Sequence, residues 1–541
     1  MAKAANPGAA PAATGLCPEL GRGWRAVEAG AWRGFMAGEA QALDAVLRLL
    51  PGDGAVPAPA VLDGLAGLDG FFALALESPG AVVAVVDRSR SYPLFHAGEG
   101  DSFRLSNSAR TLRQASGLSE ADPLAVLEMA MSGYVTGSGT VCRGLFQLQA
   151  GEGLVLDRAM GRPQARRYYS YRPEPDPQAR EEDLLEALAA ATDAVCARTL
   201  ELAAGRPVWV PLSGGLDSRL LLCKFAEMGC PGLQAFSYGP AANYEARVAR
   251  EVAGRLGVPW FFVPTSRAQA RAWFRSPGRQ EYWRFSDGLC SLPFMQDVQV
   301  LQELLAAGRM PADAFLVNGQ SGDFITGGHL PGSLAQDEGR ADLMEYLLHK
   351  HFVLWAQLAR PENRERIRAK ALRLLGLDPD ARLDASAYER WEWQERQCKY
   401  VINGQRAYDF FGLAWDLPLW RAPYYDFWRR VPVRFKLGQG LYKSYLRQYD
   451  YKGLFREFDP KVWRWPGWTM AVPVVAQAVG LVAGRRGKDR FYKYCSYFGH
   501  YSDKCAAYPF REFAAEIARA KNVLSLFART WIAENGLEFP A

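Results

Sequence analysis

The chain has 541 residues, of which 49% are hydrophobic. This is more than one hydrophobic core usually serves, so we expect two or three globular domains. The net charge is only +6, from 64 basic and 58 acidic residues without a block of like charges, which argues against a dedicated nucleic-acid binder. The nine cysteines are scattered and suggest no zinc knuckle or redox pair. Reduced thiols of this kind favour a cytoplasmic protein.

The N-terminal third predicts a tail, a β-rich domain and a linker, in that order. Residues 1–16 hold one lysine, two prolines and no continuous apolar run, so we expect a flexible tail rather than a secretory signal. Short apolar runs broken by Gly and Pro then predict the antiparallel strands of a domain over residues 17–165. A polar stretch with several prolines predicts a linker over residues 166–182.

Residues 183–541 predict a second domain with a parallel α/β sheet. A helical pattern from Asp183 precedes the run VWVPL, and the runs LQAFSYG, WFFVP and AFLVNG predict further strands. We expect a helix between the second and third of these strands, over about residues 244–256. Beyond about Gly339, helical spacing and dense aromatic residues predict a helical cap over the sheet.

One later segment, Met470–Ala483, is strongly apolar. It contains Pro473 and is shorter than the ~20 residues that a membrane-spanning helix needs, so we expect no transmembrane segment. Arg485, Arg486 and Lys488 follow it. Two interpretations stay open, a buried helix, which we favour, and a helix that contacts a membrane surface.

The most informative motif is SGGLDS at residues 213–218, between the strand VWVPL and a helix expected to begin near Ser218. Two adjacent glycines let the backbone approach phosphate oxygens closely, and the helix N-terminus offers unpaired N–H groups. Asp217 is then explained as a ligand of the magnesium that accompanies a nucleotide. The motif lacks the G-K-[ST] end of a kinase-type loop, so transfer of the γ-phosphoryl group is not favoured.

This motif resembles the PP-loop of the ATP pyrophosphatase superfamily, whose members split ATP into AMP and pyrophosphate. Further segments over about residues 60–450 resemble glutamine-dependent asparagine synthetase in the family's order: LDGFFALAL with Asp87-Arg88 and Pro93-Leu94-Phe95, GYVTGSGTVCRGLFQLQAGEGLVLD, FSYG, NGQSGDFITGGH, LPLWRAPYYDFWRRVPVRFKLG and KSYLRQY. The resemblance implies a β-rich class II glutaminase-like (Ntn-type) N-terminal domain and a parallel α/β PP-loop synthetase domain with a helical C-terminal part.

The resemblance also implies a set of site residues. Magnesium would be held by Asp217 and Asp323, which count among the catalytic residues together with Gln320 and Lys443. The residues expected at ATP and pyrophosphate are Ser213, Gly214, Gly215, Leu216, Asp217, Ser218, Tyr238 and Gly319.

Three departures from the family pattern change the expected chemistry. Glutaminase members use a cysteine exposed after Met removal, whereas position 2 here is Ala and Cys17 lies inside the chain, so we expect a degenerate glutaminase domain. Gln320 stands where the family has a glutamate, and an amide cannot act as a base at neutral pH. The expected Arg-x-Lys reads Arg464-Trp465-Pro466, which leaves Lys443 and Lys461 as substitutes. His329 is interpreted as a local hydrogen-bonding group.

The predicted reaction is adenylation of a carboxylate followed by amide formation. The substrates would be a small-molecule or sugar-linked carboxylate and an amine or ammonia, with a separate glutaminase as a potential partner. We rank amidation of a sugar uronic acid in bacterial surface-polysaccharide assembly first and intramolecular lactam or lasso-peptide closure second. A tRNA-modifying enzyme and an inactive scaffold remain alternatives, although the modest charge disfavours binding of nucleic acid.

Overall fold

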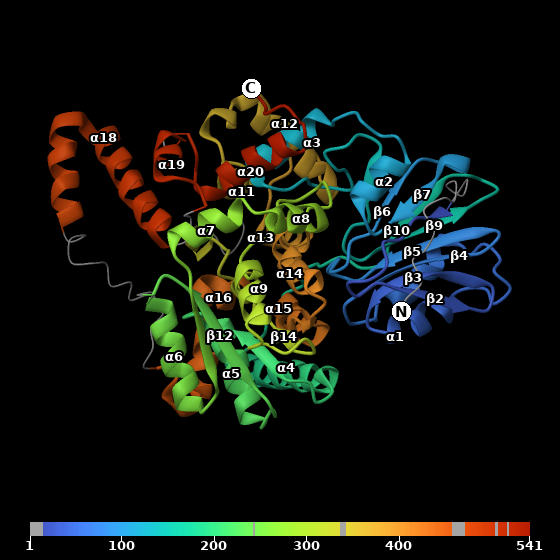
Figure 1. Cartoon of the computed structure of the whole chain (residues 1–541), viewed down its shortest axis with the longest axis horizontal. Coiled ribbons are helices and arrows are strands. Elements are labelled where there is room, and N and C mark those ends of the chain that lie inside the picture. The colour runs from blue at the N-terminus through green and yellow to red at the C-terminus, as the bar shows by residue number, and fades with distance from the viewer. Residues whose placement is uncertain (1–14, 242–243, 336–341, 457–470, 504–506, 517–518) are drawn as a thin grey trace. The chain divides into compact units, whose positions relative to one another are not determined.

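The computed structural model describes residues 15–241, 244–335, 342–456, 471–503, 507–516 and 519–541 (Figure 1). These residues form two compact units. The first contains the described residues up to Val126 together with Val135–Ser170 and Asp287–Ser291. The second contains Leu127–Tyr134, Tyr171–Ser286 and the described residues from Leu292 onward. The tail predicted over residues 1–16 lies outside the described residues except for its last two positions.

The larger sheet of the first unit has six antiparallel strands in the order β10-β9-β5-β4-β3-β2. Their bounds are Arg25–Ala29 (β2), Trp32–Gly38 (β3), Phe72–Glu77 (β4), Ala81–Val86 (β5), Glu152–Asp157 (β9) and Pro163–Arg167 (β10). The central strand β5, AVVAVV, is buried along its whole length, as a β-branched apolar run in mid-sheet should be. One core of this unit packs Leu74, Val83 and Val155 against Val46 and Leu62.

A second sheet of the same unit has the order β1-β7-β6-β8. The pairing of β1 with β7 is parallel and the other pairs are antiparallel, so the antiparallel prediction holds for every pair of this unit but one. The remaining elements before the second unit's sheet are β1 (Gly15–Leu16), α1 (Gln41–Leu47), η1 (Pro59–Leu65), β6 (Phe95–Ala97), η2 (Gly100–Ser102), β7 (Arg104–Ser106), α2 (Ala109–Ala115), α3 (Pro123–Ser132) and β8 (Leu145–Gln147).

The chain passes from the first unit to the second within the segment predicted as a linker. Its first residues, Arg166 and Arg167, end strand β10. The hydroxyl of Tyr168 donates to the Val86 carbonyl at 2.7 Å in the first unit. The ring of Tyr171 stacks on that of Trp393 in the second unit, with ring centroids 4.4 Å apart.

The second unit contains the predicted parallel sheet, in the order β13-β12-β11-β14-β15. The strand β15 was not predicted, because its three residues, AWD, lie in a region of mainly helical spacing. The elements from the start of this sheet are α4 (Glu181–Ala203), β11 (Val208–Pro211), α5 (Leu216–Glu227), β12 (Gln234–Gly239), α6 (Tyr244–Leu256), β13 (Trp260–Pro264), α7 (Arg267–Phe274), α8 (Pro277–Ser286), α9 (Val298–Ala306), β14 (Phe315–Val317) and β15 (Ala414–Asp416).

The predicted helical C-terminal part is also present. Its elements are α10 (Gly322–Ile325), η3 (Gly332–Ala335), α11 (Met344–His351), η4 (Ala356–Leu358), α12 (Pro361–Leu375), α13 (Ala385–Trp391), the π-helix η5 (Glu392–Val401), η6 (Ile402–Gln405), α14 (Arg406–Phe410), η7 (Pro418–Trp420), α15 (Ala422–Arg430), α16 (Val433–Lys436), η8 (Leu437–Gln439), α17 (Gly440–Tyr449), η9 (Tyr451–Gly453), α18 (Val472–Asp503), α19 (Phe510–Glu516) and α20 (Val523–Glu534).

Helix α18 corrects the favoured interpretation of the apolar segment. The side chains of Val474, Leu481 and Val482 are 72%, 89% and 91% exposed, so this helix is not buried on that side. The buried-helix prediction was wrong because apolar composition alone does not place a side chain inside. None of the helices in the described ranges is long and apolar enough to cross a membrane.

Candidate functional site

The candidate site lies where the strand order of the parallel sheet changes direction. From β11 the chain builds β12 and β13 on one side of the sheet, and it later adds β14 and β15 on the other side. In open parallel sheets, ligands bind in the crevice at the carboxyl ends of the strands beside such a switch point. The segment after β11 is the SGG loop (residues 213–218), and the segment after β14 is the companion loop (residues 318–329).

Hydrogen bonds within the SGG loop and from Arg219 fix its shape. The Ser213 backbone N–H donates to Ser218 Oγ at 3.1 Å, and the Gly215 N–H donates to Ser213 Oγ at 3.1 Å. The buried Arg219 donates from Nη2 to the Gly214 carbonyl and from Nη1 to the Leu454 carbonyl, each at 2.8 Å. Helix α5 begins at Leu216, two residues earlier than predicted, so its N-terminus faces the loop.

The two loops cross in direct contact at Asp217. A Cβ added at Gly319 would lie 3.0 Å from the Ser218 nitrogen, and one added at Gly322 would lie 2.4 Å from Asp217 Cγ. Only glycine fits this close approach at both positions. The NGQSGD segment therefore positions the companion loop against the Asp217 carboxylate.

The negative charge of the Asp217 carboxylate is unfavourable where it lies. Burial and the nearby charge of Asp323 raise the pKa of Asp217 to about 7, although Tyr442 donates a hydrogen bond to Oδ1 at 2.8 Å. A group of this kind is stabilised by a cation. Two carboxylates on adjoining loops therefore fit a divalent ion that also takes phosphate oxygens as ligands.

A metal site made of protein groups alone is absent from the described part of the chain. No group of three or more His, Cys, Asp and Glu side chains there is arranged to hold an ion. Magnesium commonly binds through one or two carboxylates together with substrate phosphates and water. The pair of Asp217 and Asp323 matches that mode of binding.

Asp323 is linked to a network of buried charges. His329 contacts Asp323 through Nε2, at 3.2 Å from Oδ2, and contacts Glu392 through Nδ1. Desolvation acts to raise the pKa of Asp323, but the hydrogen bond and charge of His329 outweigh it and lower that pKa. Although desolvation opposes it, the charge of Glu392 and the bonds to both acids raise the pKa of His329 to about 9.

Glu392 is the centre of this network. Its carboxylate is fully buried on η5, and Lys350 Nζ lies 3.4 Å from Oε2. Desolvation favours its neutral form, but the charges of His329 and Lys350 hold the pKa of Glu392 well below its usual range. At neutral pH, His329 is therefore a cation held between two carboxylates, consistent with its predicted role as a local hydrogen-bonding group.

Gln320 lies in the companion loop beside the cap. Its backbone N–H donates to Asn318 Oδ1 at 2.9 Å, and its Oε1 lies 2.7 Å from a Cβ added at Gly404. The Nε2 atom is buried and has no hydrogen-bond partner among the described residues. A buried amide without a partner is costly, so this N–H₂ group is suited to donating to a bound ligand.

The other predicted site residues do not contact Asp217 through the bonds described below. The Tyr238 hydroxyl donates to Asp297 Oδ1 at 2.7 Å, at the carboxyl end of β12. Lys443 follows Tyr442 on α17, but its Nζ donates to the Gly438 carbonyl at 2.6 Å instead of pointing to Asp217. Leu216 is the first residue of α5 and is half-buried. Lys461 and Arg464-Trp465-Pro466 lie outside the described residues.

Sequence reasoning missed three residues that shape this site: Tyr442, Glu392 and Arg219. Tyr442 is 225 residues from Asp217 and Glu392 is 63 residues from His329, so local patterns could not pair them. One signal was present, because the segment ERWEWQERQCKY places Glu389, Glu392 and Glu395 at helical spacing among aromatic residues. Charged residues that alternate with tryptophan and tyrosine along a helix indicate buried ion pairs.

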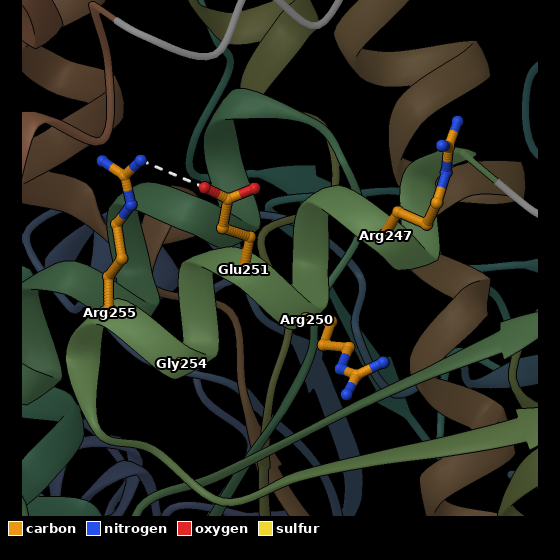
Figure 2. Close-up of a pocket in the computed structure, with 5 residues that line it drawn as sticks. All are labelled: Arg247, Arg250, Glu251, Gly254 and Arg255. Carbon is orange, nitrogen blue, oxygen red and sulfur yellow. Dashed lines mark hydrogen bonds and ion pairs between the residues drawn. The ribbon is translucent and has the colours of Figure 1, made fainter.

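A shallow cavity of about 490 Å³ lies on the outer side of α6 (Figure 2). Its lining residues are Arg247, Arg250, Glu251, Gly254 and Arg255. Glu251 pairs with Arg255 at 3.0 Å along the helix. None of the predicted site residues lines this cavity, so it is separate from the crossing at Asp217.

Residues 188–454 match the family model of asparagine synthase. The matched region contains the whole parallel sheet, both loops and the Glu392 network. This match supports an asparagine synthetase-like family member. The family match supports a ligase that uses ATP, a carboxylate and an amine or ammonia to form an amide. A comparison with curated proteins finds no match to this chain.

Proposed function

We propose that this protein adenylates a carboxylate, releases pyrophosphate, and then joins the acyl group to an amine with release of AMP. The observation that carries the proposal is the crossing of the SGG loop and the companion loop at Asp217, with Gly319 and Gly322 in contact with it. It combines a phosphate-binding turn with two carboxylates at the carboxyl edge of the sheet. Kinase-type chemistry would need a lysine in the loop, and the SGG loop has none.

In the first step, a carboxylate oxygen attacks the α-phosphorus of ATP and pyrophosphate leaves. The Gly214 N–H group and the hydroxyls of Ser213 and Ser218 hold the departing pyrophosphate, and the Gly215 N–H joins them by exchanging its bond to Ser213 Oγ for a phosphate oxygen. Magnesium held by Asp217 and Asp323 would offset the charge of both partners. Arg219 has a positioning role: it donates to the Gly214 carbonyl and so orients the loop that holds the pyrophosphate.

In the second step, the amine attacks the acyl carbon and AMP leaves. Gln320 cannot accept the proton, and His329, with its pKa of about 9, is already protonated at neutral pH. The amine therefore enters in its neutral form, and the proton that it loses on forming the amide passes to the phosphate of the departing AMP or to water. The unpartnered Nε2 of Gln320 donates to an oxygen of the acceptor and positions it.

We infer that the carboxylate is a sugar uronic acid or a similar polyhydroxylated acid used in bacterial surface-polysaccharide assembly. The NGQSGDFITGGH segment, which resembles relatives of that kind, supports this choice. The first unit then serves as a degenerate glutaminase-like (Ntn-type) domain. Burial raises the pKa of the Cys17 thiol, so this cysteine is poorly suited to act as a nucleophile.

The test is formation of AMP with ammonium and a panel of uronic acids, with free aspartate as the comparison acid. We expect AMP and amide only when magnesium and a uronic acid are present, and we expect Asp217→Asn to abolish both. Asp380→Asn, a change of an exposed aspartate, is the matched control and should leave the rate unchanged. Equal AMP from wild type and Asp217→Asn would refute the site, and activity with aspartate alone would refute the acceptor.

A further inference from the structure

Helix α18 exposes apolar side chains in a cluster. Among the described residues, six of the ten exposed large hydrophobic side chains lie on this helix: Val474, Val475, Leu481, Val482, Tyr492 and Tyr494. The other four are scattered over the first unit, as single exposed apolar residues usually are. The cluster on α18 therefore calls for a partner.

The helix is bent into two arms at Gly484 (Figure 1). Gly484 has φ 67° and ψ −173°, a conformation that is open essentially to glycine only. Near the bend the arms touch, because a Cβ added at Gly480 would lie 3.3 Å from Lys488 Cδ. The most exposed residues, Leu481 and Val482, lie beside this bend and form its apolar tip.

The first arm of α18, before Gly484, has a buried side and an exposed side, and both carry apolar residues. Ala476 is fully buried, so one side packs against protein, whereas Val474, Leu481 and Val482 occupy the exposed side. The spacing of 474, 481 and 482 places these residues on one face of the helix. No charged residue occurs between Ala471 and Gly484. The exposed face of this arm therefore carries no charge, and its polar side chain is the exposed Gln477.

The second arm begins with strong positive charge. Residues 485–494 contain five basic residues and one acidic residue. Arg485 and Arg490 are exposed, and the Lys488 stem lies across Gly480 of the apolar arm. Tyr492 and Tyr494 follow on the same arm, each 38% exposed. Tyrosine favours the boundary between headgroups and acyl chains, and basic side chains favour anionic headgroups.

We propose that the bent helix α18 docks on a membrane surface that contains anionic phospholipids. The apolar tip at Leu481 and Val482 enters the interface, and Arg485, Lys488 and Arg490 contact the phosphate groups. Charge complementarity favours this partner over a second copy of the chain, because two copies would bring their basic arms together. The proposal is independent of the reaction and holds whatever the acceptor is.

Docking at a bilayer would place the enzyme beside membrane-bound compounds. Surface-bound helices of this type insert without spanning, and α18 does not meet the requirements of a spanning helix. The contact should be reversible, because apolar insertion is small and the electrostatic part is screened by salt.

The test is sedimentation of the full chain with vesicles, either phosphatidylcholine alone or equal parts of phosphatidylcholine and phosphatidylglycerol. We expect binding to the mixed vesicles that weakens as salt increases, and at least about tenfold weaker binding to phosphatidylcholine alone. Two double variants, Leu481→Glu/Val482→Glu and Arg485→Glu/Lys488→Glu, should each lower binding to the mixed vesicles by about tenfold or more. Met160→Glu, an exposed apolar position in the first unit, is the matched control and should bind like wild type.

Thermal unfolding and AMP formation should be unchanged in the α18 variants, since Leu481, Val482 and Arg485 are exposed, Lys488 is half-buried, and all four are remote in sequence from both loops. Absence of binding to mixed vesicles would overturn the proposal. Binding that survives both double variants would overturn it as well. A dimer in analytical ultracentrifugation that the Leu481→Glu/Val482→Glu variant dissociates, without vesicle binding, would show that a second copy covers the tip instead.

Discussion

The contact between Gly322 and Asp217 offers a precise perturbation of the site. In Gly322→Ala, the new methyl carbon would lie 2.4 Å from Asp217 Cγ and 2.6 Å and 2.7 Å from its two oxygens. Ordinary contacts between carbon atoms are about 3.5–4.0 Å, so the carboxylate or the companion loop must move by about 1 Å. Gly322 has no positive φ, so the effect comes from this contact and not from backbone strain.

The expected consequence is a loss of rate with little change in affinity for the acid. A misplacement of about 1 Å can cost about 10²-fold in rate, which corresponds to about 2.7 kcal/mol of transition-state stabilisation. The assay is steady-state AMP formation, with kcat and KM determined separately for ATP and for the carboxylate. We expect kcat to fall by about this factor.

Gly332→Ala is the matched control for this variant. Gly332 lies shortly after the companion loop, and a Cβ added there meets no heavy atom within 4 Å. Its rate should equal that of wild type. The reasoning would be refuted if Gly322→Ala kept the wild-type kcat, or if the control lost as much rate as the test variant.

Three further predictions concern the charges of the site. The folded state binds a proton at Asp217 more tightly than the unfolded chain does, so this group stabilises the fold at low pH, and that contribution is lost as pH rises through about 7. In Asp217→Asn, the free energy of unfolding measured without magnesium should therefore change less between pH 4 and pH 8 than in wild type. Glu392→Gln should lower the free energy of unfolding by about 3–5 kcal/mol at pH 7, and NMR titration should show the pKa of His329 falling from about 9. Glu345→Gln, at a surface ion pair, is the control and should lower the free energy of unfolding by at most about 1 kcal/mol. Arg219→Lys keeps the charge but not the two-pronged contact, so it should lower kcat by at least about tenfold, and an unchanged kcat would remove its positioning role.

The sequence was sufficient for the SGG loop because that signal is local. A β-branched run, two glycines and a following helix occur within a few residues, and the order of the strands predicted the parallel sheet. The helix over residues 244–256 was also predicted with the bounds that α6 has. These features depend on spacing along the chain and require no knowledge of distant contacts.

The remaining features depend on tertiary contacts. The bond from Tyr442 to Asp217 and the burial of Glu392 beside His329 bring together residues that no local pattern links. Strand β15 was missed because three residues among helical patterns carry no periodicity. Helix α18 was expected to be buried, and only the structure shows Leu481 and Val482 on its exposed side.

The most direct test of the adenylation mechanism follows the oxygen atoms of the acid. A carboxylate labelled with the heavy oxygen isotope is incubated with the enzyme, ATP, magnesium and ammonium, and the phosphate products are examined by ³¹P NMR. Attack on the α-phosphorus at the crossing of the two loops predicts that one labelled oxygen appears on AMP and none on pyrophosphate. Label in inorganic phosphate accompanied by ADP would show attack on the γ-phosphorus and would contradict the account.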